Sequence, residues 1–417
     1  MARVGKIYWL VILLFVAFSC NKDSFDDASS CNKDSFDDAS EYDDDVVDKT
    51  QSVLVYMASN NNLYSYSLKN IDSLVRNYNE DHYRTGNMVV YQRGIGDSPK
   101  LMVIDNDTSA TVVKTYDEHN AADTLVLRQV IDDFKTLFPA DNYGCILWSH
   151  GTAWLPQTFT NYATKSSSQS SYSLGDKGES IENHPYYDQI RQQSWSYSTK
   201  AFAEEDDTWI EIDELARALE DSEFNFIMFD ACYMMSIEVA YELRNKASWM
   251  LGAPTEVISN GFDYSTMAYN FFLDIPINER LIKVADDMVD KYSEATVSLV
   301  NLDKMSSFAQ KYSAILDSIP DILSAASPYS VQRYDRFSDH VLFDMSDYIY
   351  TIAPDYGAEM DSLLDDIVEY KRATDTFLYI SLAKYCGVSS YIPFENYTSV
   401  TPFYKELSWW KNVMQKD

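Results

Sequence analysis

The chain has 417 residues and the composition of a folded globular protein, with 46% hydrophobic and 14% aromatic residues. Its 65 acidic residues exceed its 33 basic residues, which gives a formal net charge of −32. This charge argues against a nucleic-acid partner, because binding a phosphate backbone requires dense patches of Lys and Arg. The cysteines form no C-x-x-C pair and the histidines no H-E-x-x-H motif. The residues therefore predict neither a disulfide framework nor a metal site.

Residues 1–20 have the features of a targeting segment. Arg3 and Lys6 precede an apolar run at 7–18, which is short for a membrane span, and Cys20 follows that run closely. The arrangement resembles a bacterial lipobox, although Phe18 differs from the small residue usual two positions before the cysteine. We predict a lipoprotein signal peptide lipidated on Cys20, with a plain secretory signal as the alternative.

The segment after Cys20 is repetitive and acidic. The 11 residues SCNKDSFDDAS occur twice in tandem, at 19–29 and 30–40. Residues 21–50 have too few apolar side chains to form a core, so we predict a disordered tether. A lipid followed by an acidic tether predicts a protein of the bacterial cell envelope, anchored by lipid at the outer membrane or cell surface.

The folded part alternates strands and helices. Apolar runs predict strands at 52–57, 88–92, 100–104 and 110–116, and helical spacing of apolar residues predicts helices through Leu68, Ile71 and Val75 and over 123–138. Three asparagines at 60–62 suit a turn and a helix N-cap. This alternation predicts an α/β fold with a mostly parallel central sheet covered by helices on both faces.

Two apolar strands end in residues that can do chemistry. Residues 143–150 (YGCILWSH) end in His150 and are followed by Gly151, and residues 224–232 (FNFIMFDAC) end in Cys232. The carboxyl ends of parallel strands are where open α/β sheets carry reactive groups. A neighbouring imidazole activates a thiol for acyl transfer, and backbone N–H groups at Gly151 and Cys232 are candidates for the oxyanion site. The alternative is a buried strand cysteine and an unrelated histidine.

The second half completes the prediction. Residues 155–208 form a long polar loop between the two strands. Further strands are expected at 248–253, 296–301, 377–381 and 387–393, and helices at 279–292, 304–326, 343–352 and 357–370. We assign 51–300 to the core and 301–417 to an extension packed on it, because no proline-rich linker separates them.

Several motifs in order carry a resemblance. WSHG at 148–151 followed by Trp154, FDAC at 229–232, IEVAYEL at 237–243, a loop ending in DY at 263–264 and GVSSYIP at 387–393 resemble the clostripain family of cysteine peptidases. The resemblance implies a caspase-like fold, a dyad of His150 and Cys232, and cleavage of proteins or peptides after Arg or Lys. Ala153 and Phe262 stand where the family often has Gly and Trp, so we expect an altered pocket rim.

The resemblance also implies secondary roles. Asp230 would meet the substrate cation, with Asp263 and Glu256 as weaker candidates, and Asp230 could also satisfy backbone N–H groups. Self-cleavage in the 155–208 loop would occur at Lys165 or Lys200. No cofactor is required; some members respond to calcium, and here acidic residues are plentiful without a calcium-loop motif.

A second function stays open at this point. A non-catalytic surface lipoprotein of the same fold could bind peptide or glycan. The presence of both His150 and Cys232 favours the peptidase, since a binding protein needs neither.

Overall fold

The computed structural model describes residues 49–155, 201–206, 208–319, 330–337, 340–393 and 400–415. The predicted signal peptide, Cys20, nearly all of the predicted tether, Lys165 and Lys200 lie outside these residues. All description below concerns the folded unit that begins at Val47.

A nine-stranded sheet in the described residues has the strand order β12-β10-β9-β8-β5-β1-β2-β3-β4. The five central strands, from β9 to β2, run parallel, and the strands outside them join antiparallel. The prediction of an α/β fold with a mostly parallel central sheet is confirmed. In chain order the strands are β1 (Gln51–Ser59), β2 (Gly86–Gly94), β3 (Lys100–Val103), β4 (Thr111–Thr115), β5 (Asn142–Trp148), β8 (Phe224–Asp230), β9 (Ala247–Gly252), β10 (Thr296–Asn301) and β12 (Val368–Ala373).

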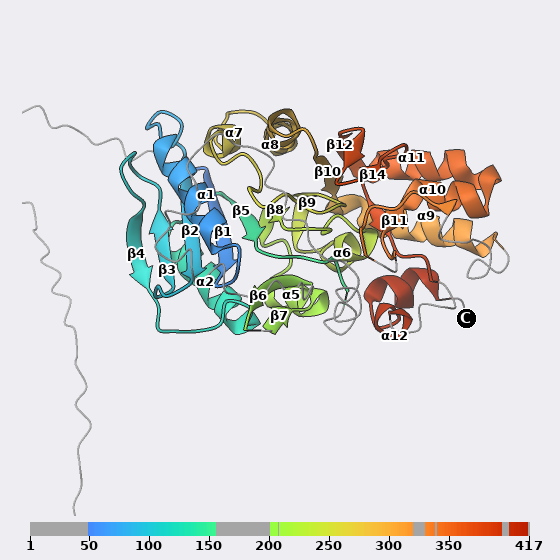
Figure 1. Cartoon of the computed structure of the whole chain (residues 1–417), viewed down its shortest axis with the longest axis horizontal. Helices are drawn as coiled ribbons and strands as arrows, with labels where there is room; N and C mark the ends of the chain where they lie inside the picture. Colours follow the sequence, from blue (N-terminus) through green and yellow to red (C-terminus); the bar gives the residue numbers. More distant parts are fainter. Residues whose placement is uncertain are drawn as a thin grey trace, which may run out of the picture. The chain divides into compact units, whose positions relative to one another are not determined.

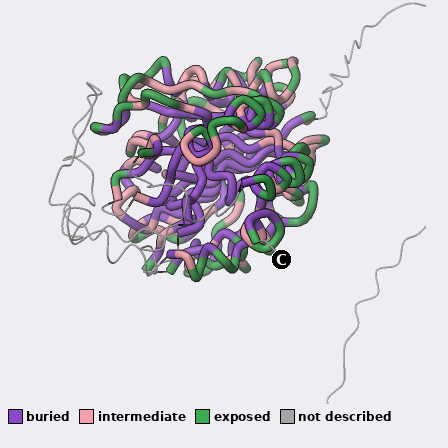
Figure 2. The backbone as a smooth tube through the Cα atoms, turned by 90° about the vertical axis from the view of Figure 1, so that its right-hand side faces the viewer, coloured by how far each residue is buried: buried purple, intermediate pink, exposed green. Residues whose placement is uncertain are grey.

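Helices cover both faces of this sheet. Along β1, Leu54 and Tyr56 point into one hydrophobic core while Val53 and Val55 point into the other, as strand geometry requires. Figure 1 shows α7 and α8 above the sheet and α2 and α5 below it, and in Figure 2 the strands are the buried centre. One face carries α1 (Tyr64–Arg76), α7 (Met267–Phe271) and α8 (Ile277–Lys291); the other carries α2 (Thr124–Leu137), α5 (Ile212–Ala218), α6 (Ile237–Glu242), α9 (Met305–Asp317), α10 (Met345–Ile352), α11 (Gly357–Ile367) and α12 (Thr401–Tyr404).

The C-terminal part differs most from the predicted elements. The helix predicted over 357–370 ends at Ile367, because the chain then continues as β12 and pairs with β10 at the sheet edge. The sheet therefore extends past residue 300 into the predicted extension. The strand predicted over 377–381 is a turn between β13 (Thr376–Phe377) and β14 (Ile380–Ser381), where Leu378 and Tyr379 have positive φ.

Three smaller differences concern lengths. Helix α9 ends at Asp317, earlier than the periodicity predicted, and the strand predicted over 387–393 is reduced to β15 (Ser389–Ser390), which pairs with β11 (Phe343–Asp344). The end of the predicted 155–208 loop is not loop but β6 (Phe202–Glu205), which pairs with β7 (Thr208–Ile210). In none of the ranges that the structure describes is a helix both long and apolar enough to cross a membrane.

Candidate active site

His150 and Cys232 follow two adjacent parallel strands. Trp148 of β5 pairs with Asp230 of β8, so each of the two residues lies two positions beyond a matched pair. The backbone N–H of Ser149 also donates to the carbonyl oxygen of Asp230 at 3.4 Å. The structure thus brings both predicted residues to the same edge of the sheet.

Gly151 packs tightly against the residues that follow β8. A Cβ placed on Gly151 would lie 2.9 Å from the Cβ of Ala231 and 2.9 Å from the carbonyl oxygen of Cys232. Only glycine therefore permits this approach of the two backbones. The N–H groups of Gly151 and Cys232 donate to no described residue, so both predicted oxyanion donors are unengaged in this part of the chain.

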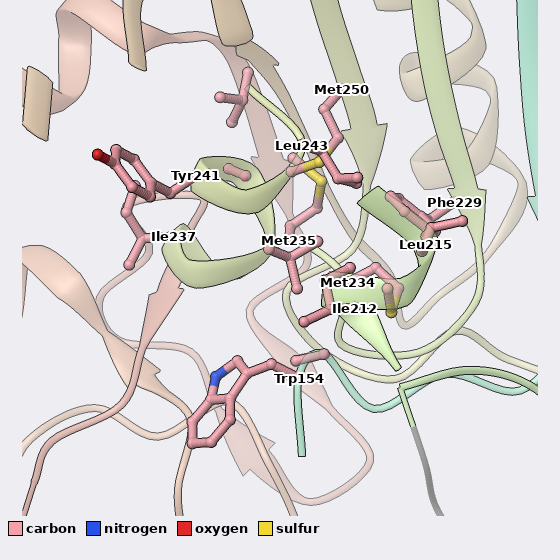
Figure 3. Packing of buried hydrophobic residues seen from close by; sticks show 14 of the residues in the cluster. Trp154, Ile212, Leu215, Phe229, Met234, Met235, Ile237, Tyr241, Leu243 and Met250 are labelled. Atoms are coloured by element: carbon pink, nitrogen blue, oxygen red, sulfur yellow. The ribbon is translucent and has the colours of Figure 1, made fainter. Parts of the chain in front are cut away.

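The turn after Cys232 is anchored in the core. Tyr233 has a φ of 66°, which reverses the chain immediately after the cysteine. The next two side chains, Met234 and Met235, are fully buried, and Figure 3 shows them within the cluster that surrounds α6. The Ser236 hydroxyl accepts from the N–H of Val239 and caps α6. Packing on both sides therefore fixes the backbone that carries the thiol.

The imidazole of His150 contacts polar groups on the side away from β8. Its Nε2 lies 2.6 Å from Oδ1 of Asn62 and 3.6 Å from a carboxylate oxygen of Glu204. The ring of Trp209 lies 6.3 Å away between centroids. Burial lowers the pKa of His150 to about 4 although 26% of its side chain is exposed, so the imidazole is neutral at physiological pH.

The neighbours of His150 come from two segments that the sequence analysis did not assign to the site. Asparagines 60–62 do not cap α1: the N-cap position is Leu63, and no side chain caps it. Instead Asn60 Nδ2 donates to Glu205 at 2.8 Å, and Asn61 Nδ2 donates to the carbonyl oxygen of Glu204 at 2.8 Å. One sequence signal could have identified Asn62 as a neighbour of His150. The asparagine run directly follows a buried strand, just as His150 follows β5.

The sulfur of Cys232 is held by one residue of the loop that follows β9. The N–H of Val257 donates to Sγ at 3.3 Å, and the thiol lies 3.6 Å from the carbonyl oxygen of Val257. Burial, followed by the negative charge of Glu256, raises the pKa of the thiol to about 12. No hydrogen bond joins the sulfur to His150 in the described part of the chain. The cysteine is therefore a protonated thiol here.

The same loop covers Asp230. Its Oδ2 accepts from the hydroxyl of Tyr264 at 3.0 Å and from the N–H of Phe262 at 3.3 Å. Gly261, with a φ of 70°, packs against the carboxylate. Only 4% of Asp230 is exposed, and burial outweighs these hydrogen bonds and raises its pKa to about 7.

The two weaker pocket candidates are already paired. Glu256 binds Arg336 through two contacts of 2.5 and 2.8 Å, and Asp263 binds Lys291 at 2.9 Å. Residues 254–264, hereafter the covering loop, are thus fixed by an ion pair near each end. Asp230 remains the predicted pocket residue without a basic partner in the described ranges.

The described residues around His150 and Cys232 form no metal centre, and a cavity found in the structure lies elsewhere. Within the described ranges, no three His, Cys, Asp or Glu side chains are grouped so that they could hold a metal ion. A cavity of about 460 Å³ lies instead among residues of the C-terminal part, including Asp344, Asp361 and Lys384.

Comparison with known proteins decides the family. The model of the clostripain family matches residues 55–177 and 174–392. The chain belongs to the clostripain family. It is a cysteine peptidase, and the alternative of a non-catalytic binding protein is not favoured. No curated protein matches the sequence.

Solved structures agree with this assignment. An inactive zymogen C11 protease from Parabacteroides distasonis matches with a TM-score of 0.73 and 27% identity, covering 88% of this chain and 99% of that one. A secreted C11 cysteine protease from Bacteroides thetaiotaomicron, in complex with an irreversible peptide inhibitor, matches with a TM-score of 0.67 and 24% identity over 88% and 99% of the two chains. The second likeness shows the fold alone.

Proposed function

We propose that this clostripain-family peptidase is an endopeptidase that uses Cys232 as nucleophile and His150 as base. The observation that carries the proposal is the register of β5 and β8, which brings the two residues to adjacent strand ends. The neutral imidazole would accept the thiol proton as the sulfur attacks the scissile carbonyl, and would then protonate the leaving amine. The unengaged N–H groups of Gly151 and Cys232 would stabilise the oxyanion.

Specificity for Arg or Lys before the cleaved bond rests on Asp230. A buried carboxylate without a basic partner gains stability when a cationic side chain reaches it. Since the covering loop packs on Asp230 through Gly261 and Tyr264, the pocket opens only if this loop moves. Glu256 and Asp263 then act on the loop through Arg336 and Lys291.

Self-processing and location complete the proposal. Lys165 and Lys200 are the candidate sites of self-cleavage in the 155–208 segment, and lipidation of Cys20 would anchor the protein in the bacterial envelope. Peptide mapping by mass spectrometry of active protein tests both: cleavage after either lysine and a lipid on Cys20 support the proposal, and a single uncut, unlipidated chain contradicts these two parts of it.

Fluorogenic peptides ending in Arg or Lys test the catalytic part. Wild type should release the fluorophore, and Cys232→Ala and His150→Ala should not. Cys145→Ala is a matched control, because Cys145 is a buried thiol in the interior of β5. Turnover by Cys232→Ala, or none by wild type after nicking of the 155–208 segment with trypsin, would exclude the dyad.

A further inference from the structure

His150 is the middle member of a row of three polar residues. In the sheet, β5 lies between β1 and β8, and the three strands are parallel. Asn62 follows β1, His150 follows β5 and Cys232 follows β8. The edge of the sheet therefore places an amide on one side of the imidazole and a thiol on the other.

The contacts of Nε2 determine which nitrogen of His150 carries the hydrogen. Oδ1 of Asn62 at 2.6 Å and the Glu204 carboxylate at 3.6 Å are both acceptors. Nε2 must therefore be the N–H donor, and Nδ1 is left with a free lone pair. Nδ1 forms no hydrogen bond with any residue in the described ranges, so it is the nitrogen that can take a proton.

The turn that carries Asn62 is built to hold it in place. Oδ1 of Asn61 accepts from the N–H of Leu63 at 2.9 Å, and Nδ2 of Asn61 donates to the Glu204 carbonyl oxygen. Asn60 donates to the carboxylate of Glu205, whose charge is balanced by Arg93 at 3.0 Å. Asn62 thus reaches His150 from a turn whose other two asparagines are engaged.

We propose that Asn62 is the positioning residue of the active site, a third member beside His150 and Cys232. The proposal rests on the proposed dyad. As the bond between sulfur and carbonyl carbon forms, the thiol proton moves to Nδ1, and it passes to the leaving amine when the carbon–nitrogen bond breaks. The bond from Nε2–H to Asn62 strengthens while the ring is charged, so Asn62 orients the ring and stabilises the imidazolium.

Three variants test this role. Asn62→Ala removes the acceptor and Asn62→Asp replaces it with a nearly isosteric carboxylate. Asn60→Ala disturbs the same turn without touching the ring. The readouts are kcat and KM on an Arg peptide, the pH dependence of kcat/KM, and the rate at which iodoacetamide alkylates Cys232.

The expected results follow from how each side chain at position 62 interacts with the charged imidazole of His150. Asn62→Ala should lower kcat by about tenfold or more, part of the ~10²–10⁴ that a positioned base contributes, with little change in KM. Asn62→Asp should move the acidic limb of the kcat/KM profile upward by about 1 pH unit or more, because a neighbouring anion favours the charged imidazole. Asn60→Ala should leave the limb where it is.

The outcomes separate the two proposals. An unchanged acidic limb in Asn62→Asp, or full kcat in Asn62→Ala, overturns the role of Asn62 while the dyad stands. Turnover that persists in Cys232→Ala overturns the dyad itself. If Asn62→Ala does not fold, Asn62→Asp alone decides, since it preserves shape.

Discussion

The backbone of Val257 contacts the thiol of Cys232 through two groups: its N lies 3.3 Å and its carbonyl oxygen 3.6 Å from Sγ. The covering loop therefore contacts the partly exposed sulfur of Cys232, and its other end covers the buried Asp230. Contacts that hold this loop in place should therefore control access to Cys232 and Asp230.

Releasing the covering loop should expose the thiol further. In Glu256→Gln the charge that pairs with Arg336 is lost, and the anion that raises the pKa of Cys232 is removed with it. Both effects favour the thiolate, so alkylation of Cys232 by iodoacetamide at neutral pH should become several-fold faster. Glu406→Gln, which removes an exposed ion pair elsewhere, is the control. Equal alkylation rates in the two variants would refute the idea that the Glu256–Arg336 pair holds the covering loop over the thiol.

The buried carboxyl of Asp230 should make stability depend on pH. Its pKa rises from an ordinary value of 3.8 to about 7 on folding. The folded state therefore binds the proton more tightly, and stability is lost as pH rises between these two values, at about 1.4 kcal/mol per pH unit. Asp230→Asn should thus gain stability over wild type above pH 7 and gain little at pH 4, as measured by urea unfolding.

Asp263 provides a control, because its pKa is shifted in the opposite direction to that of Asp230. Burial opposes its ionisation, but bonds from Ser265 and Lys291 outweigh burial and lower its pKa. Asp263→Asn should therefore be less stable than wild type at neutral pH, and the difference should vanish as pH falls through that lowered pKa. A pH-independent difference in either variant would show that the carboxyl does not titrate as assigned.

Adding a methyl group at Gly151 should disturb the close packing of the two strand ends. In Gly151→Ala the new Cβ meets Ala231 and the backbone of Cys232 at 2.9 Å, so the backbone that follows β5 or β8 must shift. We expect a loss of about 1–3 kcal/mol in unfolding free energy, and a loss of turnover larger than that seen when wild type is destabilised equally by urea. Retention of full activity would mean that this contact does not set the site.

An ion pair at the end of β8 opposite to Cys232 should matter to stability alone. Glu223, whose side chain is fully buried, binds Arg128 of α2 at 2.7 Å. Arg128→Ala leaves that carboxylate without its main partner and should cost about 3–5 kcal/mol. Arg76→Ala, which breaks the exposed pair with Asp72, should cost less than about 1 kcal/mol. Similar losses of unfolding free energy in the two variants, measured by calorimetry, would show that the Glu223–Arg128 pair is no more important to stability than an exposed pair.

The sequence was sufficient for most strands of the sheet and for the two strand ends. The apolar runs that end in His150 and Cys232 have no solvent-facing alternation, which identifies buried parallel strands, and both were predicted close to their observed limits. The predictions that were wrong concern elements whose structure depends on partners distant in sequence. Val368 begins a strand because β10 offers a free edge, and no local pattern in VEYKRA shows that.

The surroundings of the site were beyond sequence reasoning for the same reason. Asn62 reaches His150 across 88 positions, and Val257 reaches Cys232 across 25. These contacts depend on strand order, which places β1 and β8 on opposite sides of β5. The resemblance implied Asp263 and Glu256 as weaker pocket candidates, and their pairing with Lys291 and Arg336 could be seen only in three dimensions.

Labelling by a peptide that ends in Arg and carries an electrophilic ketone tests the central claim most directly. After incubation and digestion, mass spectrometry should find one adduct, on Cys232, and His150→Ala should reduce its rate of formation sharply. An adduct on Cys145 or Cys386, or inhibition that leaves Cys232 unmodified, would contradict the account.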